Sequence, residues 1–151
     1  MIVAMAADHA GWPLRARIIA EIASLGHQPL DCGSAAMVVG DDYPDVAAAV
    51  ARAITAGRAD RGVVICGSGV GAAIAANKIR GIRACMCHDS FSARQGVEDD
   101  DMNVLCFGAR VIGEELAADL LRDFLGATFS GAERHRRRAE KIAALEARFS
   151  D

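Results

Sequence analysis

Short apolar runs alternate with longer amphipathic stretches along the whole chain. These mostly apolar runs cover residues 2–7, 29–32, 62–66, 82–87 and 104–107, and Asp31 and Arg83 are their charged residues. Short runs of nearly continuous apolar residues are typical of strands buried on both faces of a sheet. After the first run, Leu14, Ile18 and Ile22 recur at the spacing of one helix face. The pattern therefore predicts five strands with helices between them.

The segments between and after the predicted strands carry helix signals. Pro13 suits the first turn of a helix, and Gly26 suits the residue after its end. Asp45 is predicted as the N-cap of the next helix, which runs to about residue 56. Further helices are predicted over residues 72–77, 89–98, 113–125 and 133–148. Strands joined by helices imply right-handed crossovers. We therefore expect one α/β domain over residues 1–151, a doubly wound, Rossmann-like three-layer sandwich with a five-stranded parallel sheet.

Charge and cysteine content exclude several classes of partner. The net charge of -3 provides no overall attraction to nucleic acid or to an anionic membrane. No apolar run approaches the roughly 20 residues that span a bilayer, and none resembles a secretory signal. The cysteines are odd in number and lie mostly in apolar runs: Cys32, Cys66, Cys85, Cys87 and Cys106. With Cys66 set apart, this predicts reduced, buried thiols in a cytoplasmic protein that binds neither nucleic acid nor a membrane.

The strongest chemical signal is Cys66-Gly-Ser-Gly-Val-Gly71, at the carboxyl end of the third predicted strand. Ligands of doubly wound sheets bind at that edge. The glycines let several backbone N–H groups converge, and the following helix adds its positive end. The thiolate of Cys66 should be favoured there. A base beside an anion hole is what proton abstraction next to a carbonyl requires, because the enediolate must be stabilised.

Two other interpretations of this loop stay open on the residues alone. Gly67-Ser-Gly-Val-Gly-Ala72 also fits the G-x-G-x-x-A dinucleotide fingerprint, with Asp89 as the candidate ribose-binding acid. That fingerprint normally occupies the first turn between strand and helix, whereas this one follows the third strand. The other interpretation is a buried cysteine before an ordinary glycine turn.

The motifs around this loop form a specific series. In chain order they are Asp8-His9-Ala10-Gly11, Asp42-Tyr43-Pro44, the Cys66 loop, Ala76-Asn-Lys-Ile-Arg-Gly-Ile-Arg-Ala84, Asn103-Val-Leu105, Phe107-Gly-Ala-Arg-Val-Ile-Gly113, and Arg134-His135 with Arg138. The series resembles the ribose-5-phosphate isomerase B family, which includes the galactose-6-phosphate isomerase subunits, over essentially the whole chain. The resemblance implies aldose–ketose isomerisation through a cis-enediolate, foremost of ribose 5-phosphate to ribulose 5-phosphate, without a metal or cofactor. It also implies a homodimer, or a tetramer, with active sites at the subunit interface.

The resemblance also assigns roles by position. Cys66 would be the base that moves a proton between carbon 2 and carbon 1 of the sugar. Ser68, at a position that is often threonine in the family, would pass protons between the two substrate oxygens. The loop amides would hold the enediolate charge: those of Gly67, Ser68, Gly69, Val70 and Gly71.

Substrate and phosphate contacts are assigned in the same way. Asp8 and Tyr43 would contact the sugar. The phosphate would be bound by His9, Arg110, Arg134 and Arg138, the last two on a C-terminal helix that reaches in from the partner subunit. The spacing agrees independently, because Arg134 and Arg138 are four residues apart and share one face of a helix.

One position departs from the family pattern. Members that act on cyclic sugars typically carry histidine and then asparagine shortly before the fifth strand, and this histidine is thought to open the furanose ring. In this chain the two residues are Asp99 and Asp100, which take the catalytic and the substrate-binding position. A carboxyl group is normally ionised at neutral pH and is then a poor proton donor.

Several interpretations of this departure stay open. Asp99 replaces the histidine, or the ring opens without it, or the substrate is never cyclic. A tetrose 4-phosphate cannot close a furanose ring, because its 4-hydroxyl is esterified. Erythrose or erythrulose 4-phosphate is therefore the alternative substrate. A non-catalytic sugar-phosphate-binding subunit is the alternative to an enzyme.

Overall fold

A parallel sheet of five strands forms the centre of the computed structural model, which describes residues 1–149. The strands are β1 (Ile2–Ala7), β2 (Gln28–Asp31), β3 (Arg61–Cys66), β4 (Ala84–Met86) and β5 (Val104–Gly108). They lie in the order β2-β1-β3-β5-β4, and each neighbouring pair is parallel. This confirms the predicted five-stranded parallel sheet.

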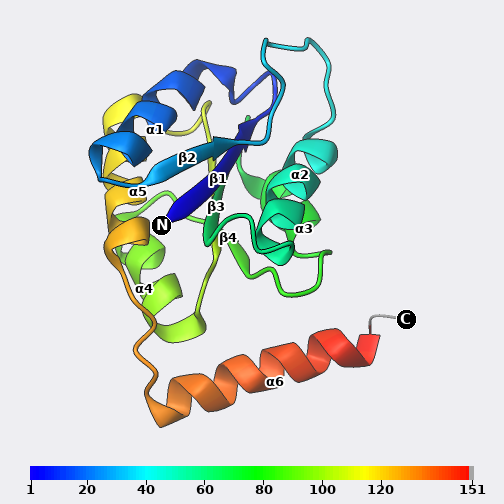
Figure 1. The fold of residues 1–151 in the computed structure, drawn as a ribbon, viewed down its shortest axis with the longest axis vertical. Coiled ribbons are helices and arrows are strands. Elements are labelled where there is room, and N and C mark those ends of the chain that lie inside the picture. Colours follow the sequence, from blue (N-terminus) through cyan, green and yellow to red (C-terminus); the bar gives the residue numbers. More distant parts are fainter. Residues whose placement is uncertain (150–151) are drawn as a thin grey trace.

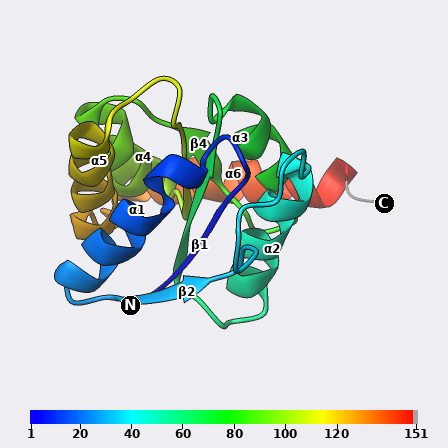
Figure 2. The same ribbon diagram turned by 90° about the horizontal axis from the view of Figure 1, so that it is seen from above.

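Helices cover both faces of the sheet. They are α1 (Trp12–Ser24), α2 (Tyr43–Thr55), α3 (Val70–Ala76), α4 (Ser90–Asp100), α5 (Glu114–Gly126) and α6 (Glu133–Phe149). Figure 2 shows α1, α4 and α5 on one side of the strands and α2 and α3 on the other. None of the helices within residues 1–149 combines the length and hydropathy needed to cross a membrane.

Alternate residues of the central strands point into two separate cores. Met5, Ile65 and Phe107 belong to the core beneath α1, α4 and α5. Ala6 and Cys66 belong to the smaller core beneath α2 and α3. All five side chains are at most 4% exposed. Because both faces are covered, β1, β5 and the part of β3 after Arg61 carry no charged residue. The last residue of β3 places its thiol on the side of α2 and α3.

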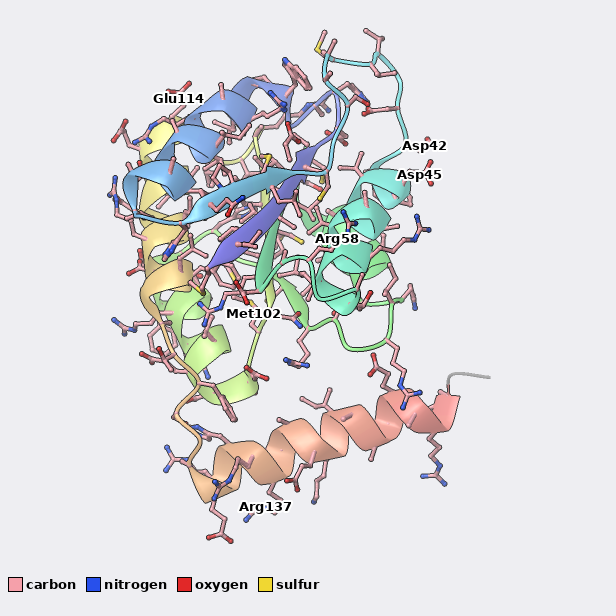
Figure 3. The ribbon with its side chains drawn as sticks, in the orientation of Figure 1. Asp42, Asp45, Arg58, Met102, Glu114 and Arg137 are labelled. Atoms are coloured by element: carbon pink, nitrogen blue, oxygen red, sulfur yellow. The ribbon has the colours of Figure 1, made fainter. Side chains whose placement is uncertain are left out.

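The start of α2 differs from the prediction. The helix begins at Tyr43 with Asp42 as its N-cap, and Asp45 lies inside the first turn. Figure 3 shows Asp42 and Asp45 at this end of α2. The predicted N-cap at Asp45 is therefore wrong. Pro44 explains the difference, because proline is tolerated in the first helical turn, where its missing N–H leaves no bond unmade.

The edge strand β4 differs as well. It is shorter than the predicted run over residues 82–87, because Ile82 N donates to Ile79 O at 3.1 Å in a turn before the strand. All five thiols are free. Cys87 and Cys106 are buried as predicted, whereas Cys32 is only partly buried. Cys85 is exposed, so its prediction as a buried thiol is wrong. The reason is that β4 lies at the edge of the sheet, where the covering layer ends.

The C-terminal helix α6 lies apart from both helical layers. It crosses the end of the molecule opposite to the loop that follows β2 (Figure 1) and packs on α4. Its apolar residues Ile142, Leu145 and Phe149 are 44%, 55% and 79% exposed. His135 is the buried residue of this helix.

Candidate active site

The carboxyl ends of β1 and β3 place Asp8 and Cys66 at one point of the sheet. These strands are neighbours, and the strand order reverses between them because β2 lies on the far side of β1. Ligands of doubly wound sheets bind at such a reversal. Asp8 N donates to Ile65 O at 3.1 Å, which ties the two strand ends together. The Asp8 side chain is fixed in turn, because its Oδ1 accepts a hydrogen bond from Gly11 N at 2.8 Å.

Cys66 faces a backbone amide of its own loop. The residue is 4% exposed, and its Sγ accepts a hydrogen bond from Gly69 N at 3.0 Å. Gly69 has a φ of 84°, a left-handed conformation that glycine adopts without the strain of a side chain. The turn at Gly69 therefore aims an N–H at the sulfur, where it stabilises negative charge.

The loop after β5 packs on the loop after β3 and brings Arg110 to the same place. Ala109 N donates to Cys66 O at 2.9 Å, and Arg110 N donates to Gly67 O at 3.1 Å. Ser68 is exposed at this edge, and its Oγ accepts a hydrogen bond from Val70 N at 3.3 Å. The hydroxyl, the guanidinium and the thiol thus come from two loops that backbone hydrogen bonds hold together.

Asp41 fixes His9, a contact that the sequence did not predict. Asp41 Oδ1 lies 2.9 Å from His9 N and 2.8 Å from His9 Nδ1. Because an ionised carboxylate only accepts hydrogen bonds, both nitrogens donate to it, and Nδ1 carries the proton. The Nε2 atom is left for a ligand. No local pattern links these residues, which meet because the loop after β2 folds over the carboxyl edge.

His88 is a second supporting residue that sequence reasoning missed. Its Nε2 accepts a hydrogen bond from Gly108 N at 3.1 Å. Gly108 ends β5, so the imidazole fixes the start of the loop that carries Arg110. The position of His88, two residues after the edge strand, was the one available signal.

Most of the predicted site residues line one cleft of about 380 Å³. Its lining consists of Asp8, His9, Ala10, Tyr43, Cys66, Gly67, Ser68, Gly71, Arg110 and Val111. A guanidinium and an imidazole suit a phosphate group, and a carboxylate and a phenol suit hydroxyl groups. The cleft can therefore hold a small, hydroxylated, phosphorylated ligand beside a thiol.

Six predicted residues do not line this cleft. Gly69 and Val70 belong to the Cys66 loop itself, and the other four lie elsewhere in the chain. Asp99 and Asp100 end α4, whereas Arg134 and Arg138 belong to the first turns of α6. None of the four lines the Cys66 cleft. Figure 1 shows α6 at the other end of the molecule from the carboxyl edge of the sheet. One protomer therefore carries two separate groups of predicted site residues.

The comparison with known proteins decides the family. The family model described as Ribose/Galactose Isomerase matches residues 3–142. The chain belongs to the ribose/galactose isomerase family. It is 42% identical to ribose-5-phosphate isomerase B of Escherichia coli K12, over 97% of each chain. It is 44% identical to D-erythrulose-4-phosphate isomerase 2 of Mycolicibacterium smegmatis, over 69% of this chain and 68% of that protein. The structure of Clostridium thermocellum ribose-5-phosphate isomerase B superposes with a TM-score of 0.95 at 41% identity, covering 99% of this chain and 100% of that one.

Membership of the ribose/galactose isomerase family makes this protein a sugar-phosphate aldose–ketose isomerase, as predicted. The dinucleotide interpretation also fails on geometry. Asp89, its candidate ribose-binding acid, is the N-cap of α4, and its Oδ1 accepts a hydrogen bond from Ser92 N at 2.8 Å. That N–H lowers the pKa of the Asp89 carboxyl group. The carboxylate therefore caps the N-terminus of α4, as aspartate commonly does at this position.

Proposed function

We propose that the enzyme moves a proton between carbon 2 and carbon 1 of a small sugar phosphate, with the Cys66 thiolate as base. The observation that carries the proposal is the Gly69 N–H directed at Cys66 Sγ, in a cleft that also holds His9 and Arg110. The thiolate takes the proton from the carbon next to the carbonyl, which leaves a cis-enediolate and a thiol. The thiol then returns the proton to the neighbouring carbon, and the sulfur regains its charge.

Ser68 and the loop amides complete the proposed proton transfer. The Ser68 hydroxyl both donates and accepts, so it can take the proton from one substrate oxygen and pass its own to the other. The amides of residues 67–71 supply the partial positive charge that the enediolate needs. Asp8 and Tyr43 would orient the sugar hydroxyls, and each lines the cleft.

Ribose 5-phosphate is the substrate that the comparison favours most. The Escherichia coli relative named for it covers nearly all of both chains. Its interconversion with ribulose 5-phosphate would place this enzyme in the pentose phosphate pathway, in the cytoplasm, where its five free thiols stay reduced.

A tetrose 4-phosphate is the second candidate, and Asp99 favours it. The carboxylate stands where a ring-opening histidine is expected, and both of its oxygens already have partners in Gln95 and His135. An acyclic substrate would need no ring-opening acid. The Mycolicibacterium smegmatis relative is named for D-erythrulose 4-phosphate, which agrees with this alternative.

We further propose that two copies of the chain, as a homodimer or within a tetramer, share each active site. The cleft carries one set of phosphate-binding candidates, His9 and Arg110, whereas Arg134 and Arg138 lie at the other end of the same protomer. A two-fold axis would bring α6 of one copy to the cleft of the other, and the reverse. A partner would also cover the exposed apolar residues of α6, which a soluble chain rarely leaves bare.

Mixing two defective variants tests the shared site. Cys66→Ala removes the base, and the double variant Arg134→Ala/Arg138→Ala removes the proposed arginines. In a co-expressed heterodimer, one site would combine both intact halves. Random pairing should then restore about a quarter of wild-type turnover. Activity no higher than the average of the two parent variants would contradict the shared site.

Replacement of the base tests the chemistry itself. Cys66→Ala should lower kcat by about 10²–10⁴-fold, whereas binding of the sugar phosphate, measured by calorimetry, should stay within about threefold of wild type. Cys32→Ser is the matched control, because Cys32 is a free thiol that does not line the cleft. Near-normal turnover of Cys66→Ala would show that another group is the base.

A further inference from the structure

His135 is an unusual residue within α6. Its neighbours Arg134, Arg136 and Arg137 are exposed, whereas His135 is 3% exposed. A buried imidazole needs partners for both ring nitrogens, because an unpaired buried polar atom is costly. The structure supplies partners for both, and one of them is Arg134.

The contacts of the imidazole ring define which of its nitrogens carries the proton. Arg134 Nε lies 2.9 Å from His135 Nε2, and a guanidinium nitrogen can only donate. Nε2 is therefore the acceptor, and in the neutral ring the proton lies on Nδ1. That atom lies 2.7 Å from Ser130 Oγ and 3.3 Å from Asp99 Oδ1. Ser130 and Asp99 thus hold His135 at Nδ1, and His135 holds Arg134 at Nε2.

Asp99 is itself anchored to α4. Its Oδ2 accepts a hydrogen bond from Gln95 Nε2, one helical turn earlier, at 2.7 Å. Next to this contact, Ser130 N donates to Glu98 O at 2.9 Å. A continuous series of contacts therefore runs from the end of α4, through Asp99 and His135, to the guanidinium of Arg134.

The far end of α6 is tied down separately. Both carboxylate oxygens of Glu146 accept from Gly81 N, at 2.9 and 3.1 Å. With an anchor near each end, the helix holds the backbones of Arg134 and Arg138 about 6 Å apart along its axis. Because Nε of Arg134 is bonded to His135, its two terminal nitrogens remain for an anion.

We propose that His135 is a positioning residue that aims Arg134 at the substrate phosphate, with Asp99 as the anchor of His135. The inference rests on the proposed function, in which Arg134 binds that phosphate. It gives Asp99 a role other than proton donor, since both carboxylate oxygens serve the contacts of His135 and Gln95. In this chain, the residue at the ring-opening position of the family belongs to the contacts that hold the phosphate-binding Arg134.

Two substitutions at His135 distinguish the contributions of the two ring nitrogens. The amide of His135→Asn reaches about as far as Nδ1, so it keeps the donor toward Ser130 and Asp99 and loses the acceptor for Arg134. His135→Gln reaches about as far as Nε2, so its oxygen can still accept from Arg134. We expect His135→Asn to raise KM for the sugar phosphate, and Ki for inorganic phosphate, about tenfold. The rise for His135→Gln should be under about threefold, and kcat should change less than about twofold in both variants.

A matched pair at Asp99 tests the anchor. Asp99→Asn keeps an oxygen that can lie near His135 Nδ1, so it should raise KM less than Asp99→Ala does, by under about threefold. Asp99→Ala removes the contact with His135 Nδ1 and should raise KM more than Asp99→Asn, by up to as much as His135→Asn. A large loss of kcat in Asp99→Asn would mean that the carboxyl group transfers a proton, and would overturn the proposed role.

The phosphate readout distinguishes this inference from the function on which it rests. If Arg134→Ala leaves Ki for inorganic phosphate unchanged, the phosphate role of Arg134 fails. If Arg134→Ala raises Ki but His135→Asn does not, the positioning role alone is overturned.

Arg137→Ala is the charge control, because Arg137 points away from the body of the protein (Figure 3). A purely structural His135 would lower thermal stability equally in the asparagine and glutamine variants, without different KM values. If His135→Asn does not fold, the Asp99 pair decides the question.

Discussion

Replacing Gly71 by alanine should lower turnover while leaving the stability of the fold nearly unchanged. Gly71 lies in the first turn of α3 and faces the ring of Tyr43 in the cleft. A methyl group at this position would lie 2.6 Å from Tyr43 Cε2 and 2.7 Å from Cζ. Such distances are well inside van der Waals contact, so the ring must move.

The size of the movement follows from those distances. Carbon atoms pack at about 3.5–4.0 Å, so the ring has to withdraw by about 1 Å. Tyr43 is 43% exposed, which leaves it room to turn toward solvent without disturbing the core. A misplacement of about 1 Å in a substrate-positioning group can lower the rate about 100-fold. Alanine is also favoured over glycine inside a helix by up to about 1 kcal/mol.

The assay combines kinetics with unfolding. We expect kcat/KM of Gly71→Ala to fall about 10- to 100-fold, whereas the free energy of unfolding in urea should stay within about 1 kcal/mol of wild type. Gly126→Ala is the control, because it ends α5 in open space and should alter neither quantity. In a Tyr43→Ala background the ring is absent, so Gly71→Ala should cause no further loss.

Two outcomes would refute this reasoning. The first is a kcat/KM of Gly71→Ala within about twofold of wild type, which would mean that the ring position does not matter for turnover. The second is full additivity of the losses from Gly71→Ala and Tyr43→Ala, which would mean that the methyl group acts on something other than the ring.

Two further predictions concern stability. The guanidinium of Arg61 donates hydrogen bonds to two backbone carbonyls at the end of α5. Arg61→Leu should therefore lower the free energy of unfolding in urea by about 3 kcal/mol. A loss below about 1 kcal/mol would mean that water replaces these bonds. A hydrogen bond from Arg17, together with the contact of Arg122, lowers the pKa of Glu21 from its ordinary value of 4.5. Its carboxylate therefore stabilises the fold above pH 4.5, and this contribution is lost as pH falls through the lower folded-state pKa. Glu21→Gln should be less stable than wild type at neutral pH, and the gap in urea midpoint should close in acid; a gap of constant size would contradict the assignment.

The strands could be predicted because a strand that is buried on both faces is apolar at consecutive positions. Residues 2–7 and 104–107 are apolar throughout for that reason, and both segments form central strands. The ends of elements were harder, because competing local signals meet there. At the start of α2, Pro44 overrode the capping preference of Asp45. At β4, a turn at Ile82 shortened an apolar run that could otherwise have continued as strand.

The site divides in a similar way between local and distant contacts. The approach of Gly69 N to Cys66 Sγ spans three residues, and the glycine spacing of the loop predicted such an amide array. The contact between His9 and Asp41 spans 32 residues, and the contact between Gly108 and His88 spans 20. No periodic pattern connects such pairs, since they depend on how separate loops fold over the sheet. The roles assigned to the arginines of α6 stay predictions.

The most direct test of the central claim is turnover of wild type and Cys66→Ala on ribose 5-phosphate and erythrulose 4-phosphate, measured side by side. We expect that wild type isomerises at least one of the two sugars and that Cys66→Ala loses this activity. A preference for ribose 5-phosphate would support the first substrate, and a preference for erythrulose 4-phosphate would support the second. Turnover of neither sugar by wild type, or equal turnover by both proteins, would contradict a small-sugar-phosphate isomerase that uses Cys66 as its base.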